Sequence, residues 1–347
     1  MSRFIMATCR PDATQWLREE VARDEPALRM SYSRPGVVTF RSETPRDDAE
    51  PLVAVFARST AHSIGFAKDV DEVVLRCEAA ELAGPLRIHV FARDPRDEER
   101  WLDADPRPGQ WTRALAERLG PRAHAGVIAE PGDLVLDVVL PQVELADPVL
   151  VGWHVHRPPR SPMPGGVVRV AVPDDVPSRA YAKLEEALAW SGAPLREGDV
   201  ALEIGAAPGG AALALLRRGL DVIAIDPAHL DERVLAHGDR VRHLRVLAER
   251  VRTRDLPGRI DWLLLDANVA PHRALVAVEH LLALRRSSVR GLLLTLKLND
   301  DGVVRDLPQL FARIAKITGD APLRATQLPS AHREVVAWVA LGSAAPV

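Results

Sequence analysis

A Gly-rich turn between two apolar runs constrains this chain more than any other feature. The run Val200 to Ile204 leads into Gly-Ala-Ala-Pro-Gly-Gly, residues 205–210. A helix of small residues, about 211–218, and a second apolar run that ends on Asp226 follow. This order of strand, Gly-rich loop, helix and strand predicts a nucleotide-binding βαβ unit. The glycines let the backbone approach a ligand closely, and Asp226 can accept both hydroxyls of an adenosine ribose.

The amino-acid sequence of the loop indicates which ligand this unit binds. A dinucleotide site uses GxGxxG, whose backbone N–H groups hold a pyrophosphate at a helix N-terminus. Here the loop is GxxPGG, and Pro208 lacks the N–H that a phosphate would need. S-adenosylmethionine carries no phosphate and fits this loop better. The loop alone leaves another nucleotide or a purely structural turn open.

Alternating apolar runs and helical stretches predict an α/β fold for residues 174–347. Near-continuous apolar strands lie in parallel sheets that helices cover on both faces, so we expect a doubly wound, Rossmann-like, mostly parallel sheet. A helix is expected from Pro177 and Ser178 to Trp190, with Ser178 as its N-cap. The other expected elements are strands at 241–246, 260–266 and 291–298, helices at 274–284 and 307–317, and a final antiparallel hairpin of 323–328 and 334–341.

The preceding part of the chain is predicted to be α+β, with strands and helices interleaved. We divide it into an N-terminal region, 1–85, and a second region, 86–157. Residues 158–173, dense in Pro and Gly, form a predicted linker, either a solvated connector or an RNA-facing arm. Strands are expected at 3–9, 86–92, 134–140 and 149–154, strand or core pieces at 36–40 and 51–56, and helices at 15–23, 69–83 and 110–119.

Composition excludes several classes of protein. The chain has 347 residues, 47% of them hydrophobic, which suits two or three domains with real cores. The net charge of −3 means that RNA binding would need a local basic face. Two cysteines without a Cys/His cluster argue against a metal site or a disulfide framework. Without a signal peptide or an apolar run of about 18 residues, we expect a soluble, cytoplasmic protein.

Four charged residues stand where apolar strands and a helix predict burial. Lys297 follows Leu-Leu-Leu-Thr-Leu, Asp266 ends a buried strand, Glu334 begins one, and Lys183 lies within the helix near Leu184. Each has a structural alternative, because a lone lysine on a helix is usually solvated and strand-end acids are common. If the strand ends converge at one sheet edge, two lysines and two acids meet beside the loop.

Such a cluster suits methyl transfer from S-adenosylmethionine to an alcohol oxygen. A hydroxyl is a weak nucleophile and needs a base. A lysine can be that base if its pKa falls toward neutrality, and a second ammonium and the sulfonium would push it in that direction. The carboxylates would orient the lysines.

The motifs, in this order, resemble those of the FtsJ-type ribose 2'-O-methyltransferases. Within that group the chain most resembles the RlmM family, bacterial methyltransferases of large-subunit (23S) ribosomal RNA that act on a cytidine. The resemblance covers about residue 158 to the end. It rests on SRAYAKLEEA (178–187), LEIGAAPGG (202–210), IAID (223–226), LLLD (263–266), LTLKL (294–298) and HREVVAWV (332–339).

The resemblance implies a Lys-Asp-Lys-Glu catalytic tetrad with a lysine general base. The tetrad falls on Lys183, Asp266, Lys297 and Glu334, and Lys297 would take the proton of the 2'-hydroxyl. The residues implied to bind S-adenosylmethionine are Ser178, Gly205, Ala207, Pro208, Gly209, Gly210, Asp226 and Asp266.

The chain departs from the family at the cofactor site. It has Ala211 where relatives have Trp, and Leu247 where they have an acid near the adenine, with Glu249 two residues later. Residues 4–11 and 56–58 resemble segments of proteins with a THUMP RNA-binding module. Because RlmM enzymes carry such a module ahead of the catalytic domain, the resemblance implies that 86–157 is THUMP-like.

Three other functions were weighed against an RNA 2'-O-methyltransferase. Base methyltransferases on THUMP scaffolds use Asp/Asn-Pro-Pro-Tyr/Phe after the fourth strand, whereas this chain has Asp-Ala-Asn-Val at 266–269. The intact tetrad argues against a non-catalytic RNA-binding protein of the same fold, but the altered adenine pocket leaves that function open. A nicotinamide dehydrogenase would need a different loop. The expected partner is therefore 23S ribosomal RNA, with no DNA or membrane, and the protein is expected to be a monomer.

Overall fold

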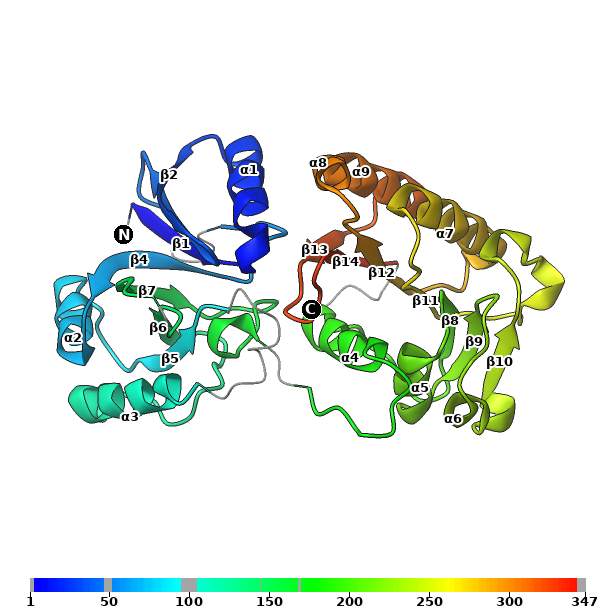
Figure 1. The fold of residues 1–347 in the computed structure, drawn as a ribbon, viewed down its shortest axis with the longest axis horizontal. Coiled ribbons are helices and arrows are strands. Elements are labelled where there is room, and N and C mark those ends of the chain that lie inside the picture. Colours follow the sequence, from blue (N-terminus) through cyan, green and yellow to red (C-terminus); the bar gives the residue numbers. More distant parts are fainter. Residues whose placement is uncertain (1–2, 47–51, 95–104, 144, 168–169, 342–347) are drawn as a thin grey trace. The chain divides into compact units, whose positions relative to one another are not determined.

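The computed structural model describes residues 3–46, 52–94, 105–143, 145–167 and 170–341. The chain forms two compact units, residues 1–168 and 169–347 (Figure 1). The division falls within the predicted linker, and each unit contains one seven-stranded sheet.

The first unit is α+β, with strand order β2-β3-β1-β4-β7-β6-β5. Neighbouring strands are antiparallel except β5 and β6, which are parallel. Helix α1 contacts β2 and β3, α2 contacts β4, and α3 contacts β5. The elements are β1 (Phe4–Thr8), α1 (Thr14–Asp24), β2 (Leu28–Arg34), β3 (Val37–Ser42), β4 (Ser59–Ala67), α2 (Val70–Ala79), β5 (Arg87–Ala92), α3 (Arg107–Leu119), β6 (Leu134–Leu140) and β7 (Val149–Val155).

The four strands and three helices expected in this unit are present, and the piece at 36–40 is a strand, with ends shifted by a few residues. Sequence analysis missed β2, whose side chains are mostly exposed, and β4, which contains two serines, a histidine and a glycine. Residues 52–56 form no strand; Leu52 and Phe56 are buried as core instead. The backbone N–H groups of Val55 and Phe56 donate to the Glu20 carboxylate rather than to a neighbouring strand, at 2.6 and 3.1 Å.

The proposed division at residue 85 falls between α2 and β5, which both belong to the first unit. The THUMP-like nature of 86–157 stays a prediction. The described part of the linker before residue 168 packs on this unit instead of standing free in solvent. Arg160 Nη2 donates to Thr60 Oγ1 at 2.9 Å, and the turn Pro164–Gly166 contacts β5.

The second unit has the predicted doubly wound sheet, in the order β10-β9-β8-β11-β12-β14-β13. The first five of these strands are parallel, and β14 is antiparallel to both β12 and β13, which confirms the terminal hairpin. The elements are α4 (Ala180–Ser191), β8 (Val200–Ile204), α5 (Gly210–Arg217), β9 (Asp221–Ile225), α6 (Glu232–Leu235), β10 (Val241–Leu244), β11 (Trp262–Leu265), α7 (Pro271–Arg285), β12 (Gly291–Lys297), α8 (Asp301–Arg305), α9 (Leu307–Thr318), β13 (Leu323–Thr326) and β14 (Glu334–Ala340).

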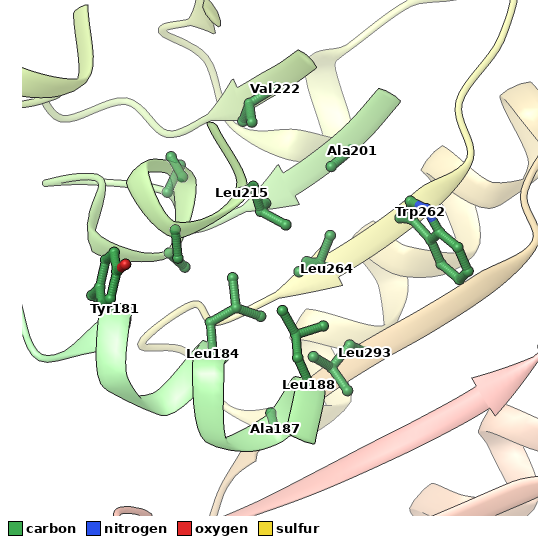
Figure 2. Packing of buried hydrophobic residues seen from close by; sticks show 14 of the residues in the cluster. Tyr181, Leu184, Ala187, Leu188, Ala201, Leu215, Val222, Trp262, Leu264 and Leu293 are labelled. Carbon is green, nitrogen blue, oxygen red and sulfur yellow. The ribbon is translucent and has the colours of Figure 1, made fainter. Parts of the chain in front are cut away.

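Helices cover both faces of this sheet, as expected for buried parallel strands. Helices α4 and α5 pack on one face, whereas α7 contacts β11 and β12 on the other (Figure 1). Figure 2 shows Leu184 and Leu188 of α4 directed toward Leu264 of β11 and Leu293 of β12. This packing fixes α4, and therefore Lys183, one residue before Leu184, at the carboxyl ends of the strands.

The N-cap prediction for α4 is wrong by one residue. The helix begins at Ala180, its N-cap is Arg179, and no side chain caps it. Ser178 Oγ instead accepts a long hydrogen bond of 3.4 Å from the Ala180 N–H.

The strand order reverses at β8, which lies between β9 and β11. In open α/β sheets a ligand binds outside the carboxyl ends of the strands at this switch point. The Gly-rich loop, residues 205–210, begins at that position.

Candidate active site

The Gly-rich loop passes so close to its neighbours that a Cβ would clash at each of its three glycines, two of which also have positive φ. Gly205 has φ +82°, and a Cβ there would lie 2.6 Å from Ala267 Cα. Gly209 has φ +112°, and a Cβ there would lie 2.6 Å from Val234 Cγ2. Both backbone conformations favour glycine, so the loop is held tightly against the end of β11 and against α6.

A cavity of about 310 Å³ opens beside this loop, between the carboxyl ends of β8, β9 and β11. Its walls carry the polar groups of two expected cofactor-binding carboxylates, Asp226 and Asp266, and the backbone of Gly205 and Ala207. Apolar atoms come from segments after β10 and β11. The cavity residues beyond these four include Ile204, Ile225, Val246, Leu247, Ala248, Glu249, Ala267, Asn268, Val269 and Arg273.

The other four expected cofactor-binding residues do not line this cavity. Ser178 lies against the first turn of α5, because a Cβ on Gly210 would meet Ser178 Oγ at 2.3 Å. Pro208 and Gly209 form the outer part of the loop, where the Pro208 carbonyl accepts from the Asp231 N–H at 2.9 Å. Their contact with a cofactor stays a prediction.

Asp226, directly after β9, already has two hydrogen bonds to the backbone. Its Oδ2 accepts from the Ala207 N–H at 3.1 Å, and its Oδ1 accepts from the Ala228 N–H at 2.8 Å. These bonds join the Gly-rich loop to the end of β9. Each carboxylate oxygen keeps a further lone pair for a hydroxyl donor.

The four charged residues singled out in the sequence form one chain of hydrogen bonds. Lys183 Nζ donates to Glu334 Oε1 and Oε2 at 2.8 and 2.7 Å. Lys297 Nζ donates to Glu334 Oε1 and to Asp266 Oδ1, each at 2.7 Å. Lys297 and Glu334 are paired residues in the register of β12 and β14. All four side chains are largely buried, with 13 to 25% of their surface exposed.

Asp266 connects this tetrad to the larger cavity, because it lines that cavity and also accepts from Lys297. The structure therefore brings the four residues together at the edge where a ligand of the Gly-rich loop would lie.

The domain that contains this site is similar to a known protein family. Residues 176–304 match the FtsJ-like methyltransferase family. The chain contains an FtsJ-like methyltransferase domain. The match covers all but one residue of the tetrad and includes the whole Gly-rich loop.

Three relatives carry the name ribosomal RNA large subunit methyltransferase M. The chain is 43% identical over 126 residues to the protein of Alkalilimnicola ehrlichii, covering 34% of each chain. It is 34% identical over 188 residues to that of Chromohalobacter salexigens, covering 51% of each. It is 31% identical over 225 residues to that of an Azoarcus species, covering 62% of this chain and 58% of the relative. The chain thus matches between about a third and three fifths of these relatives' lengths.

Lys297 of the FtsJ-like domain has a pKa that differs from the expectation for a base. Burial alone would lower it, but the carboxylates of Asp266 and Glu334 outweigh burial and hold the pKa of Lys297 above its usual value. Burial would raise the pKa of Glu334, but the ammonium groups of Lys183 and Lys297 outweigh it and lower that pKa. The lowering expected of the lysine is therefore absent from the protein alone, because two carboxylates lie within 2.7 Å of Nζ.

One ionisable residue beside the tetrad, Glu203, was not among the site residues predicted from the sequence. Glu203 lies in the middle of β8, is 2% exposed, and faces a small cavity beneath the tetrad. The sequence does contain a signal for Glu203, because it is a charged residue within an apolar strand, the same pattern that singles out Lys297.

The two departures from the family also have clear positions in the FtsJ-like domain. Ala211 is buried and lines the small cavity beneath the tetrad. Leu247 lines the larger cavity together with Glu249, whose carboxylate lies 3.9 Å from Arg273 Nε.

The part of the chain that the structure describes has neither a cluster of metal ligands nor a helix that could span a membrane. No group of three or more His, Cys, Asp or Glu residues in those parts of the chain could hold a metal ion. Within the same residues, no helix has the length and apolar character needed to cross a bilayer.

Proposed function

We propose that this chain is an S-adenosylmethionine-dependent RNA ribose 2'-O-methyltransferase that acts on a cytidine of large-subunit (23S) ribosomal RNA. The observation that carries the proposal is the Lys183–Glu334–Lys297–Asp266 chain of hydrogen bonds at the mouth of a cavity beside a GxxPGG loop. The names of the relatives support the RNA substrate.

The larger cavity suits S-adenosylmethionine. Gly205 allows a ligand to approach the backbone, and Asp226 offers acceptors for the two ribose hydroxyls. Val246 and Leu247 supply apolar surface for an adenine ring, and Pro208 in the loop lacks the N–H that a phosphate would need. When bound, the cofactor supplies an electrophilic methyl group and a positive sulfonium. Ser178, Pro208, Gly209 and Gly210 would complete its binding through the outer loop.

Lys297 is the general base in this proposal. In its neutral form, Nζ accepts the proton of the ribose 2'-hydroxyl while the hydroxyl oxygen forms its bond to the methyl carbon and the bond from that carbon to sulfur breaks. S-adenosylhomocysteine, the methylated ribose and a Lys297 ammonium result. The tetrad then holds the proton until it returns to solvent.

The remaining three residues position and tune Lys297. Asp266 fixes Nζ at the cavity, and Glu334 fixes it from the other side. Lys183 holds both oxygens of Glu334, so that the Glu334 charge acts on two ammonium groups and not on Lys297 alone. Lys183 and the sulfonium would both favour the neutral form of Lys297.

The proposal includes RNA as the only nucleic-acid partner, action as a monomer and location in the cytoplasm. A base methyltransferase is less suited, because Ala267 and Asn268 follow Asp266 where such enzymes carry two prolines. A non-catalytic RNA-binding role would leave the buried tetrad without a use.

The proposal is tested by transfer of a labelled methyl group from S-adenosylmethionine to RNA that lacks the corresponding modification. The product is mapped by its resistance to alkaline cleavage, which requires a free 2'-hydroxyl. We expect label on a ribose oxygen of 23S ribosomal RNA. Label on a base would indicate base methylation, and cofactor binding without transfer to any RNA would contradict the proposed activity.

A further inference from the structure

Glu203 is a buried acid of the FtsJ-like domain that the proposed reaction does not use. The buried acids Glu186, Asp199 and Asp261 accept hydrogen bonds, whereas the side chain of Glu203 has none among the described residues. It lies on β8 opposite Leu264 of β11 and Ala224 of β9, both apolar. Its side chain is 2% exposed, and within the described residues its Oε2 has no hydrogen-bond partner. A buried carboxylate without hydrogen bonds or a paired cation is very costly, whereas a neutral carboxylic acid is far less so.

The charges around Glu203 come from five elements, and the cations among them that the structure describes, Lys183 and Lys297, are already paired. Asp226 after β9 and Asp266 after β11 both disfavour a negative charge on Glu203. On α4, β12 and β14, the ammonium groups of Lys183 and Lys297 already donate to Glu334 and Asp266. Burial, followed by the two aspartates, raises the pKa of Glu203 well above its usual value.

A cavity of about 30 Å³ links Glu203 to the tetrad. Its lining includes Lys183, Asp266 and Glu334, and also the hydroxyl-bearing residues Thr295 and Ser330. This volume is sufficient for a water molecule, and although most of the lining is apolar, its charged and hydroxyl groups offer the two to four partners that a buried water needs. A protonated Glu203 can therefore donate its O–H toward the base of the tetrad, directly or through water.

We propose that Glu203 is a positioning residue that stays neutral beneath the tetrad, so that two carboxylates, and not three, act on Lys297. The inference rests on the proposed function. A third negative charge would increase the affinity of Lys297 for its proton and leave less of the neutral amine. The neutral acid also supplies a hydrogen-bond donor that keeps Asp266 in place.

Two variants of similar volume separate a polar role from simple filling of space. Glu203→Gln keeps a neutral donor and should retain methyl transfer within about twofold, with the acidic limb of its pH profile in the wild-type position. Glu203→Met keeps the volume but removes the donor and should lower turnover about tenfold, with thermal unfolding as the control for folding. Equal turnover in the two variants would reduce Glu203 to a packing residue and overturn the proposal.

Protonation is read independently of activity by infrared difference spectroscopy at neutral pH. We expect the wild type to show the carbonyl band of a protonated carboxyl group that Glu203→Gln lacks, and both proteins to bind S-adenosylmethionine equally. Absence of that band, or a tenfold loss of affinity in Glu203→Gln, would show an ionised Glu203 and overturn the proposal. Because neither readout requires RNA, a wild type that shows the band but transfers no methyl group contradicts the proposed function alone.

Discussion

Glu334 Oε1 accepts hydrogen bonds from both lysines of the tetrad, at 2.8 Å from Lys183 Nζ and 2.7 Å from Lys297 Nζ. One carboxylate thus couples the two ammonium groups. Its second oxygen is also held by Lys183, at 2.7 Å. Because Asp266 holds Lys297 from the other side, Nζ is fixed between two strand ends, and the pKa of Lys297 depends on the charges of Asp266 and Glu334.

The first prediction concerns pH. Because the pKa of Lys297 is raised, the neutral amine is scarce at neutral pH, and the rate of methyl transfer should increase with pH, about tenfold per unit on the acidic limb. Glu334→Gln removes one of the charges that raise this pKa, so its acidic limb should lie at lower pH than that of the wild type. Single-turnover rates measured across a pH series give the acidic limb of the wild type and that of Glu334→Gln. A limb that stays in place, or moves to higher pH, would mean that Glu334 does not tune the base.

The second prediction concerns the cofactor site. Asp226→Ala removes the acceptor of two backbone N–H groups and of the expected ribose hydroxyls, so affinity for S-adenosylmethionine should fall about 10- to 100-fold. Asp221→Ala, at the opposite end of β9 and exposed, is the matched control and should bind normally. Titration calorimetry compares the three proteins. Equal affinity of all three would remove Asp226 from the ribose site.

The third prediction concerns the Gly-rich loop. Gly205→Ala places a Cβ 2.6 Å from Ala267 Cα at φ +82°, which should cost about 2 to 4 kcal/mol of unfolding free energy and weaken cofactor binding. Gly258→Ala is the control, because a Cβ there has no described atom within 4 Å. Denaturant unfolding measures both variants. A Gly205→Ala protein as stable as Gly258→Ala would show that the loop does not pass this close to β11.

The fourth prediction concerns stability at the other end of the sheet. Burial would raise the pKa of Asp199, but donors from Trp262, the Arg196 backbone and Arg290 outweigh it, and the pKa is lowered. The stability that this carboxylate contributes is therefore present above about pH 4 and is lost as the pH falls through the lower, folded-state pKa. Asp199→Asn should lower the free energy of unfolding by about 1 to 3 kcal/mol near neutral pH, and this free energy should depend less on pH in the acidic range than that of the wild type.

Thermal unfolding between pH 2 and 7 tests this stability prediction, with the exposed Asp239→Asn as the control. If Asp199→Asn lost as much stability on acidification as the wild type does, Asp199 would not be the titrating group.

The doubly wound sheet and the meeting of the tetrad followed from the sequence because parallel strands place their carboxyl ends at one edge. Asp266 and Lys297 stand at two such ends, and Glu334 pairs with Lys297 across the antiparallel neighbours β12 and β14. The exact bonding could not be predicted, since it depends on how α4 rotates Lys183 toward Glu334. For the same reason, the direction of the Lys297 pKa needed the 2.7 Å contacts with two carboxylates.

The misses share a physical origin. Strand β2 exposes most of its side chains and β4 carries small and polar ones, so neither has the apolar pattern that marked the other strands. Glu203 was not predicted as a site residue because it lies within β8 and not at the strand end, where ligand-binding acids are expected. Its side chain is buried and lines the small cavity beneath the tetrad. The linker before residue 168 packs on the first unit, where Arg160 donates a hydrogen bond to the hydroxyl of the buried Thr60. The sequence alone does not indicate this contact.

The role of Lys297 as the base is the central claim, and one comparison tests it most directly. Single-turnover transfer of labelled methyl to RNA is measured for the wild type, Lys297→Ala and Lys316→Ala, the last an exposed lysine of α9. Affinity for S-adenosylmethionine is measured on the same preparations. We predict that Lys297→Ala loses about 10²- to 10⁴-fold in rate while its cofactor affinity and the Lys316→Ala rate stay normal. A near-normal rate in Lys297→Ala would contradict the assignment of Lys297 as the base.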